Sequence, residues 1–507
     1  MGDEQNPLHG FPMNDPYFHA KKVREHFEIS GVCSNFSGHE IKQSDGGKCD
    51  GVFAGWSWEK DRLEVRNDRY GFFPLYYFAR EGEIGVSTSI LRLVALGAPT
   101  ELDSAALAVF LRLGTFVGED TPFSAIRAVP PDTTFEWKDG KLRVSGRLAL
   151  GKLDRMKRSA AIDSYIQLFK AAIRRRLPPS KDFAVPLSGG RDSRHILLEL
   201  CEAGLRPQFC VTQRLRRPQP TYNDAEIAPQ LAEALKVEHV ILDQTQSPFE
   251  STLRSILETS FCSYSHGYMF VIADYLKGKV HSIYDGIGGG VLSGGFLLDT
   301  RHLTLFESSR FNELADHLLG EEIISSVLVP RQRHRLSREL AISRLTVELR
   351  KHVEAPNPVA SFIFWNRTRR HISVGPYCIL NKNVQVFSPY LDHGLYDFLA
   401  SLPASMFLDK AFHTDTIRRA YPRYAEIPYS VMQDGQFDNR HYFRKFALER
   451  AWYCLGNSRS RLVDRWFFMP RLVRCLLDKR YSASITWLGP LALYLLRLET
   501  VSEEGRI

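Results

Sequence analysis

The chain has 507 residues and a formal net charge of +8, with 44% hydrophobic and 24% charged residues. This length is too great for one hydrophobic core, so we expect two or three domains of ordinary globular composition. The basic balance suits ATP and other anionic substrates. The sequence has no dense Lys/Arg block and no nucleic-acid motif, which argues against nucleic acid as a partner.

The eight cysteines are scattered and form no Cys-x-x-Cys pair. This pattern indicates neither a structural zinc site nor a disulfide framework, so we expect reduced thiols and a cytoplasmic location. The N-terminus has no basic region followed by an apolar core, which argues against a signal peptide. The most apolar late segment, residues 485–498, is too short to span a bilayer, so we expect no transmembrane segment.

The N-terminal part of the chain predicts an antiparallel sheet. Residues 1 to about 48 are polar and indicate no clear element. Residues 52–58, 63–66 and 73–78 read as short strands separated by turns. A helix follows Leu102, with Asp103 as its N-cap.

Residues 66–77 resemble the Ala-Arg-Asp-Arg-x-Gly-x-x-Pro-Leu-Tyr-Tyr stretch of class B asparagine synthetases, and residues 102–126 continue the resemblance. The resemblance implies an α/β protein. A degenerate Ntn-type α+β sandwich domain (residues 1–150) would precede a doubly wound parallel-sheet ATP-pyrophosphatase domain (151–440) and a helical extension (441–507). In that family the first domain hydrolyses glutamine and the second adenylates aspartate.

The sequence departs from the family at its front. The family's glutaminase nucleophile is a cysteine directly after the initiator methionine, whereas Met1 is followed here by Gly2. The nearest cysteine, Cys33, cannot supply an N-terminal amine, and the family's Arg-Gly-Pro-Asp and Asn-Gly-Glu-Ile-Tyr-Asn motifs are absent. Without nucleophile and base there is no route to a thioester, so we expect no glutaminase activity.

Residues 183–204 predict a buried strand, a glycine turn and a helix. This arrangement directs backbone N–H groups and a helix N-terminus at one point, where an anion is favoured. Glycines let the main chain approach a phosphate closely, and two serines add hydroxyl donors. The carboxylate of Asp192 cannot favour a bare phosphate, so we expect it to hold Mg²⁺.

The string Ser-Gly-Gly-x-Asp-Ser lacks the Walker lysine and is instead identified as the pyrophosphate loop of ATP pyrophosphatases. The resemblance implies ATP and Mg²⁺ as ligands, Asp192 and Ser188 as catalytic residues, and Asp192 as the metal ligand. It implies nucleotide binding by the following residues: Leu187, Ser188, Gly189, Gly190, Asp192, Ser193, Val211, Gly286 and Gly288. A tight turn without a ligand is the alternative interpretation.

Beyond the loop, strands at 208–212 and 238–242 alternate with a helix at 223–235, which predicts a doubly wound parallel sheet. In the family the residue that matches Val211 packs on adenine, while a plain core valine is the equal alternative. Residues 282–296 resemble the family's Ser-Gly-Glu-Gly-Ala-Asp-Glu-Leu-Phe-Gly-Gly-Tyr loop.

In that loop the glycine spacing is kept, but the family's glutamate falls at Ile287 and its metal-binding aspartate at Gly290. Asp285 is a candidate substitute for the missing carboxylate. The family's lysine, which stabilises charge on the phosphates, is also missing from the matching segment, residues 430–437. Lys410 lies upstream as a candidate replacement.

Two basic segments stand out in the second half. Residues 366–371 form a basic cluster on an expected helix, either a phosphate or carboxylate site or a solvated face. We expect Asp392 to be structural. The tail after residue 440 is basic and aromatic, which indicates helices packed on the synthetase domain or a surface for a membrane or partner.

These observations favour an ATP-dependent, AMP-forming amide ligase without glutaminase activity. The amine would be ammonia or part of a substrate, as in the β-lactam synthetases and lasso-peptide macrolactam synthetases, which share this architecture. The acid would be a small-molecule or peptide carboxylate, and a homodimer or a partner protein is compatible with the sequence. The alternative is a nucleotide-binding descendant that acts as a partner or regulatory subunit, which the losses at Ile287 and Gly290 favour.

Overall fold

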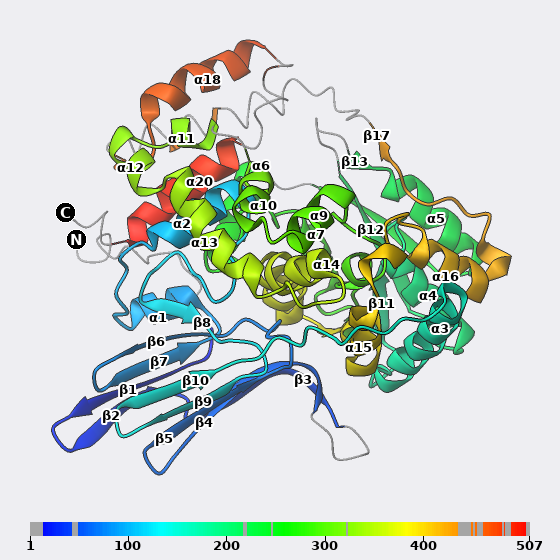
Figure 1. The fold of residues 1–507 in the computed structure, drawn as a ribbon, viewed down its shortest axis with the longest axis horizontal. Coiled ribbons are helices and arrows are strands. Elements are labelled where there is room, and N and C mark those ends of the chain that lie inside the picture. Colours follow the sequence, from blue (N-terminus) through cyan, green and yellow to red (C-terminus); the bar gives the residue numbers. More distant parts are fainter. Residues whose placement is uncertain are drawn as a thin grey trace.

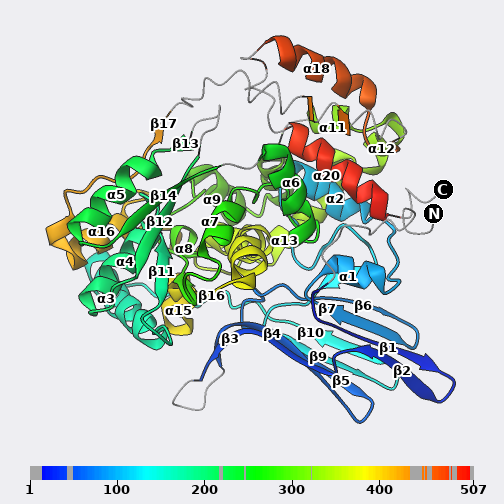
Figure 2. The same ribbon diagram turned by 180° about the vertical axis from the view of Figure 1, so that it is seen from behind.

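A computed structural model describes residues 14–42, 49–215, 221–244, 247–320, 323–433, 448–449, 452–453, 460–478, 481 and 488–502. Antiparallel sheets lie at one end of the molecule and a parallel sheet lies at the other (Figure 1). Helices pack between the two regions and around the parallel sheet, as the reverse view also shows (Figure 2).

The N-terminal region consists of two five-stranded antiparallel sheets with strand orders β2-β1-β7-β6-β8 and β10-β9-β5-β4-β3. The strands are β1 (Tyr17–Val23), β2 (His26–Gly31), β3 (Ser34–Ile41), β4 (Asp50–Glu59), β5 (Arg62–Asn67), β6 (Tyr76–Arg80), β7 (Glu83–Ser87), β8 (Ile126–Ala128), β9 (Thr134–Lys138) and β10 (Lys141–Ser145). The first three strands were not expected, because β2 is almost wholly exposed and therefore shows no apolar alternation.

The strand expected at residues 73–78 begins only at Tyr76, because the preceding residues wrap around the buried carboxylate of Asp68. That carboxylate accepts hydrogen bonds from the backbone N–H groups of Tyr70, Phe72 and Phe73. Helices α1 (Ile90–Ala95) and α2 (Ser104–Leu113) follow, and Asp103 caps α2 as predicted by accepting from the N–H of Ala106.

The second region contains a five-stranded, wholly parallel sheet of order β14-β12-β11-β15-β16. This confirms the expected parallel-sheet domain. The strands are β11 (Phe183–Pro186), β12 (Phe209–Arg214), β14 (His239–Asp243), β15 (Ser282–Tyr284) and β16 (Gln385–Phe387). The helices beside them include α3 (Arg158–Arg175), α4 (Asp192–Glu202), α5 (Asp224–Ala234), α7 (Met269–Leu276) and α16 (Phe412–Ala420). A two-stranded ribbon, β13 (Thr221–Tyr222) with β17 (Met432–Gln433), joins distant parts of the chain.

The other helices fill the space between the two regions and form the C-terminal part. They are α6 (Pro248–Glu258), α8 (Gly289–Leu292), α9 (Thr300–Glu307), α10 (Phe311–Leu318), α11 (Ile323–Val327), α12 (Pro330–Arg335), α13 (Arg338–Arg350), α14 (Pro358–Ile363), the π-helices η1 (Phe364–Ile372) and η2 (Gly375–Ile379), α15 (His393–Ser401), α18 (Arg465–Leu477) and α20 (Leu488–Val501).

The basic cluster at residues 366–371 belongs to the contact between the two regions, which corrects both sequence interpretations of it. The Asn366 side chain accepts from the N–H of Gly118 at 2.8 Å. Arg369 donates to the carbonyl of Val129 at 3.0 Å, and Arg370 donates to that of Asp120 at 2.6 Å. All three side chains are buried, so they join the regions and do not bind a ligand.

A buried ion network links the regions at a second point. Arg176, at the end of α3, pairs with Asp50 of β4 at 2.7 Å and with Asp392 at 2.7 Å, and all three side chains are 1% exposed. Asp392 also caps α15 by accepting from the N–H of Leu395. Asp392 is therefore a structural residue, as the sequence indicated.

Candidate active site

The glycine turn between β11 and α4 is held in shape by its own two serines. The N–H of Ser188 donates to Ser193 Oγ at 3.0 Å, and the N–H of Gly190 donates to Ser188 Oγ at 3.2 Å. The N–H of Leu187 donates to the carbonyl of Val211 at 2.8 Å, which fixes the start of the turn on the neighbouring strand. The loop is therefore already folded without a ligand.

The N-terminus of α4 opens directly onto this loop. Arg191 occupies the N-cap position, and no side chain caps the helix by a hydrogen bond. An uncapped helix end leaves backbone N–H groups without intrahelical partners and carries a partial positive charge. Such an end, beside two hydroxyl groups and at the carboxyl end of a parallel strand, is arranged to receive a phosphate group.

Asp192 lies in the first turn of α4. Its Oδ2 accepts from the N–H of Gly290 at 2.8 Å, and its Oδ1 lies 3.4 Å from Nδ1 of His413. Burial raises the pKa of Asp192 to about 7, against the opposing effects of the Gly290 N–H and the Arg191 charge. The side chain keeps 32% of its surface exposed, so water limits that rise and an ion from solvent can reach the carboxylate.

The second glycine loop packs against Asp192 at three positions. A Cβ on Gly286 would lie 2.7 Å from Asp192 Cβ, and one on Gly289 would lie 2.7 Å from Asp192 Cγ. A Cβ on Gly290 would lie 3.3 Å from Asp192 Oδ2. Gly288 instead adopts φ +93° and faces Leu391, so it shapes the turn and does not face the pyrophosphate loop.

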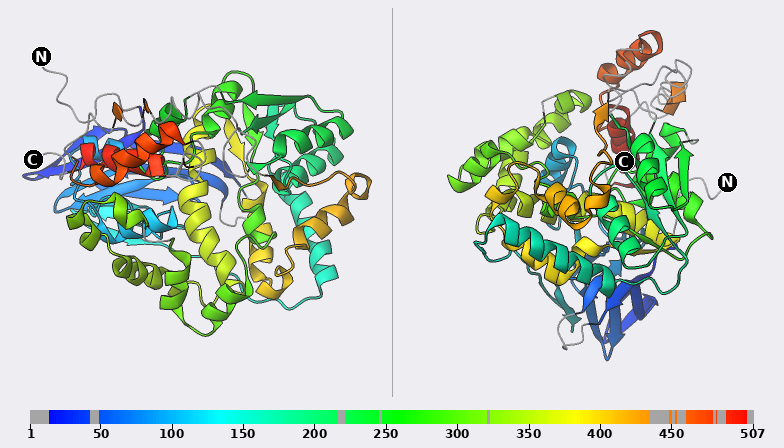
Figure 3. Two further views of the ribbon diagram at one scale, coloured as in Figure 1. Left: turned by 90° about the horizontal axis from the view of Figure 1, so that it is seen from above. Right: turned by 90° about the vertical axis from the view of Figure 1, so that its right-hand side faces the viewer.

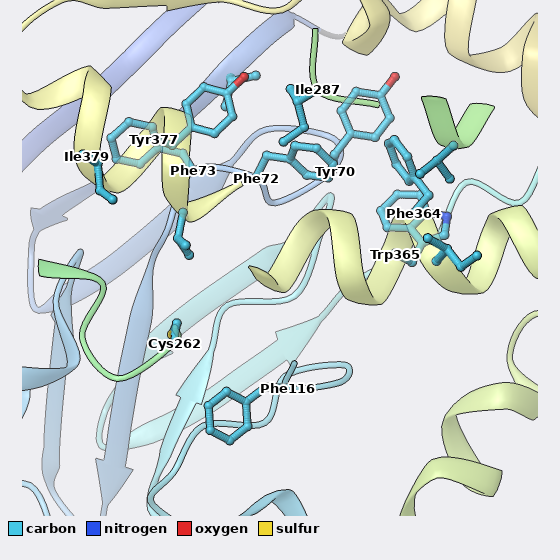
Figure 4. Packing of buried hydrophobic residues seen from close by; sticks show 14 of the residues in the cluster. Tyr70, Phe72, Phe73, Phe116, Cys262, Ile287, Phe364, Trp365, Tyr377 and Ile379 are labelled. Carbon is cyan, nitrogen blue, oxygen red and sulfur yellow. The ribbon is translucent and has the colours of Figure 1, made fainter. Parts of the chain in front are cut away.

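Two sequence expectations about single residues change at this site. Val211 has no exposed surface, which favours the core interpretation over an adenine contact. Ile287, at the position of the family's glutamate, is buried in the same apolar cluster as Tyr70 and Phe72 of the N-terminal region (Figure 4). The position is thus used for packing between the regions.

The carboxylate of Asp285 accepts from the N–H of Ile287 at 2.8 Å. Burial raises the pKa of Asp285 to about 6, and its charge contributes to the raised pKa of Asp192. The two carboxylates therefore influence each other, which keeps Asp285 a candidate for the second carboxylate of the site.

A segment that precedes β17 crosses the pyrophosphate loop. The N–H of Ser430 donates to the carbonyl of Gly189 at 2.9 Å. Arg194 donates to the carbonyls of Ile427 and Pro428, and its guanidinium lies 4.0 Å from the ring centroid of Tyr429. This is the described part of the segment in which the family lysine was sought; residues 434–437 lie outside the described part.

Several residues that the sequence did not single out complete the site. Asp224, at the start of α5, accepts from the N–H of Gly189 at 2.9 Å. Thr414 accepts from Nε of Arg191 at 2.5 Å, and Nε2 of His413 lies 3.2 Å from Nδ1 of His195. Asp224 was detectable because it follows a parallel strand, whereas α16 carries no local signal of its place. Lys410 is exposed, and no described contact links it to the loop.

Comparison with known proteins bears directly on this arrangement. The sequence model of asparagine synthase matches residues 164–434, which is more than half of the chain. The chain belongs to the asparagine synthase family. A glutamine amidotransferase domain model matches residues 39–146, within the antiparallel-sheet region of this family member. A search of curated proteins found no match to the sequence.

Solved structures similar to this asparagine synthase family member include an NMN synthetase from Francisella tularensis, at 15% identity and a TM-score of 0.22, covering 43% of this chain and 96% of that one. An NH3-dependent NAD synthetase from Campylobacter jejuni is 14% identical with a TM-score of 0.20, covering 39% and 95%. These scores are too low to support an argument, so the family match carries the assignment.

The described residues contain no group of three or more His, Cys, Asp and Glu side chains that could hold a metal ion by themselves. Nor does any helix in the described part of the chain have the length and apolar character needed to cross a membrane.

Proposed function

We propose that this chain is an ATP-dependent amide ligase that forms AMP and pyrophosphate. A carboxylate oxygen of the acid substrate attacks the α-phosphorus of ATP, and the bond to the bridging oxygen of the pyrophosphate breaks. An amine then attacks the acyl carbon, AMP leaves, and the amine loses a proton. The amine is ammonia or a group on the substrate itself.

The observation that carries this proposal is the uncapped N-terminus of α4, which opens between Ser188 and Ser193 with Asp192 in its first turn. Backbone N–H groups and hydroxyls there can bind the leaving pyrophosphate, which lowers the energy of the transition state. The Cβ contacts at Gly189 and Gly286 support a main chain that can approach the anion closely.

The site also fits a magnesium ion held together with ATP. Mg²⁺ is usually bound through one or two carboxylates and substrate phosphates and keeps several waters, so a site with fewer than three protein ligands is sufficient. Asp192 would hold it, with Asp285 close enough to act on the same charge. When bound, Mg²⁺ neutralises charge that develops on the phosphates. Arg191 supplies a further cation beside the loop.

Exchange of labelled pyrophosphate into ATP, measured with a panel of carboxylic acids, tests the proposal. Acid-dependent exchange is the expected result. Asp192→Asn should remove exchange, because it removes the charge that anchors Mg²⁺, with a loss on the order of 10² to 10³ or more. Its thermal melting should match the parent, because asparagine keeps the size and the hydrogen-bonding oxygen. A variant that melts far below the parent would make Asp192 a structural residue.

A second candidate function is nucleotide binding without catalysis, in a partner or regulatory subunit. The burial of Ile287 among residues of the N-terminal region favours it, since the position of a family carboxylate now serves packing. Calorimetric titration with Mg²⁺ and ATP separates the two: binding without exchange for any acid or amine would support this second function.

We also predict that the chain releases no glutamate from glutamine. The Arg-Gly-Pro-Asp and Asn-Gly-Glu-Ile-Tyr-Asn motifs of the family's glutaminase are absent from the sequence. Cys33 is exposed directly after β2, and Cys49 precedes β4. Glutamate release that a cysteine-directed reagent abolishes would contradict the prediction.

A further inference from the structure

The net charge of the chain is confined to one segment. Residues 440–480 contain 11 Lys and Arg against 3 Asp and Glu, a net charge of +8, and the rest of the chain contains 55 residues of each sign. The same segment contains eight aromatic residues. Attraction to an anionic partner by net charge is therefore a property of this segment and not of the catalytic regions.

Helix α18 lies in this segment and is attached to the body along one side. The N–H of Asp464 donates to the carbonyl of Val327 at 2.7 Å, and its carboxylate pairs with Arg333 at 3.0 Å. Leu472 is buried at 4% exposed. The helix lies at the periphery of the molecule, away from both sheets (Figures 1 and 3).

The opposite side of α18 presents an apolar stripe to solvent. Trp466 is 75% exposed, Val473 is 53% exposed and Leu477 is 82% exposed, and Pro470 between them is exposed as well. Their spacing of i, i+4, i+7 and i+11 places all four on one helix face. Arg474 flanks this face with 62% of its side chain exposed.

We propose that this face of α18 binds an anionic lipid membrane surface. A helix with an apolar face that includes Trp, set in a basic segment, is suited to lie in the interface with its apolar side among the acyl chains. The charge of the segment complements anionic headgroups. Nucleic acid explains the charge but not the stripe, because aliphatic side chains such as Val473 and Leu477 make no contact with phosphates and no stacking with bases.

The test uses the full-length protein and sedimentation with vesicles of phosphatidylcholine alone or mixed with phosphatidylglycerol. The protein should bind the mixed vesicles and not the neutral ones, and salt should weaken the binding. Equal binding to both, or binding to neither, overturns the proposal. Binding of an oligonucleotide in place of the anionic vesicles would assign the segment to nucleic acid and also overturn it.

Matched variants locate the contact. Val473→Glu puts a carboxylate in the stripe and should abolish vesicle binding, whereas Val347→Glu, at a valine on α13 that is 57% exposed, should not. Arg474→Glu should lower the partition coefficient on the order of tenfold, while Arg143→Glu in β10, with a side chain that is 85% exposed, should leave it unchanged. Vesicle binding by Val473→Glu equal to that of the parent would contradict the assignment.

A fluorescence measurement distinguishes insertion from purely electrostatic contact. Lipids brominated on the acyl chain should quench the emission of Trp466, and Trp466→Phe should lose that part of the quenching. Quenching that is identical in parent and variant would place the contact elsewhere. Thermal melting of each variant checks that the exposed substitution has not unfolded the chain.

Discussion

At the scale of single residues, the two neighbouring glycines of α8 differ in what a side chain would meet. A Cβ on Gly290 points at the end of the Asp192 carboxylate at 3.3 Å, while one on Gly289 would be 2.7 Å from Asp192 Cγ and 2.9 Å from the Tyr390 ring. The first contact is with a side-chain oxygen and the second with two crowded groups. The position of Gly290 is also where the family sequence places its second metal-binding aspartate.

We therefore predict that Gly290→Asp tightens the binding of Mg²⁺ with ATP on the order of tenfold, because the charge of the ligands sets the affinity of such sites. Without Mg²⁺ the two carboxylates repel each other, so the variant should melt below the parent and recover when Mg²⁺ is added. Gly289→Ala is the matched control and should lose binding, because its methyl group displaces Asp192. Unchanged affinity in Gly290→Asp, measured by calorimetry, would mean that Asp285 already supplies the second carboxylate.

At the scale of elements, the end of α3 is tied to both regions through two adjacent arginines of different burial. Arg176 is 1% exposed and pairs with Asp50 and Asp392, whereas Arg175 is 40% exposed and pairs only with Asp392. Removing one partner of a buried ion group leaves an uncompensated buried charge, which is far more costly than removing an exposed partner.

Arg176→Met should lower the free energy of unfolding by about 3 to 5 kcal/mol. Arg175→Met should lower it by about 1 kcal/mol or less. Denaturant unfolding of both variants measures the difference, and the double variant Asp50→Asn with Arg176→Met should recover part of the loss. Similar losses from the two single variants would mean that the buried network does not join the regions energetically.

At the scale of the whole molecule, buried histidines set the response to acid. Burial lowers the pKa of His39 to about 4, with the Arg176 charge acting in the same direction. Burial likewise lowers the pKa of His266 to about 4 and that of His352 to about 3, with Arg367 and Lys351 contributing. Each histidine is neutral in the fold over a range in which the unfolded chain binds a proton.

Stability should therefore be complete above pH 6.5 and fall as the pH drops from 6.5 toward 4, the interval between the unfolded and folded pKa values. Each group contributes a slope of about 1.4 kcal/mol per pH unit, or about 4 kcal/mol per unit for the three. Denaturant unfolding at a series of pH values measures the slope. His352→Asn should reduce it by about a third, and a flat profile over this interval would contradict the prediction.

Local features of the fold were predictable from the sequence because they depend on neighbours along the chain. The strand, glycine turn and helix at residues 183–204 follow from apolar periodicity, glycine conformation and a C-terminal glycine, and Gly204 indeed adopts φ +77°. The parallel sheet follows from alternating strands and helices. The family resemblance on residues 66–77 and 183–193 was confirmed by the family match.

Other conclusions required the tertiary structure, because they depend on contacts between residues more than a hundred positions apart. The sequence could not show that Arg369 and Arg370 are buried against the N-terminal region, since a basic cluster reads the same on a solvated helix. The crossing of the loop by Ser430 and the approach of His413 to Asp192 are likewise set by packing alone.

The sequence by itself determined the loop, the two kinds of sheet and the missing carboxylates. The structure decided which charges are buried between the regions, which line the loop and which remain on the surface of α18. The physical reason is that burial is a property of the folded surface, and it controls both the pKa of a group and whether a ligand can reach it.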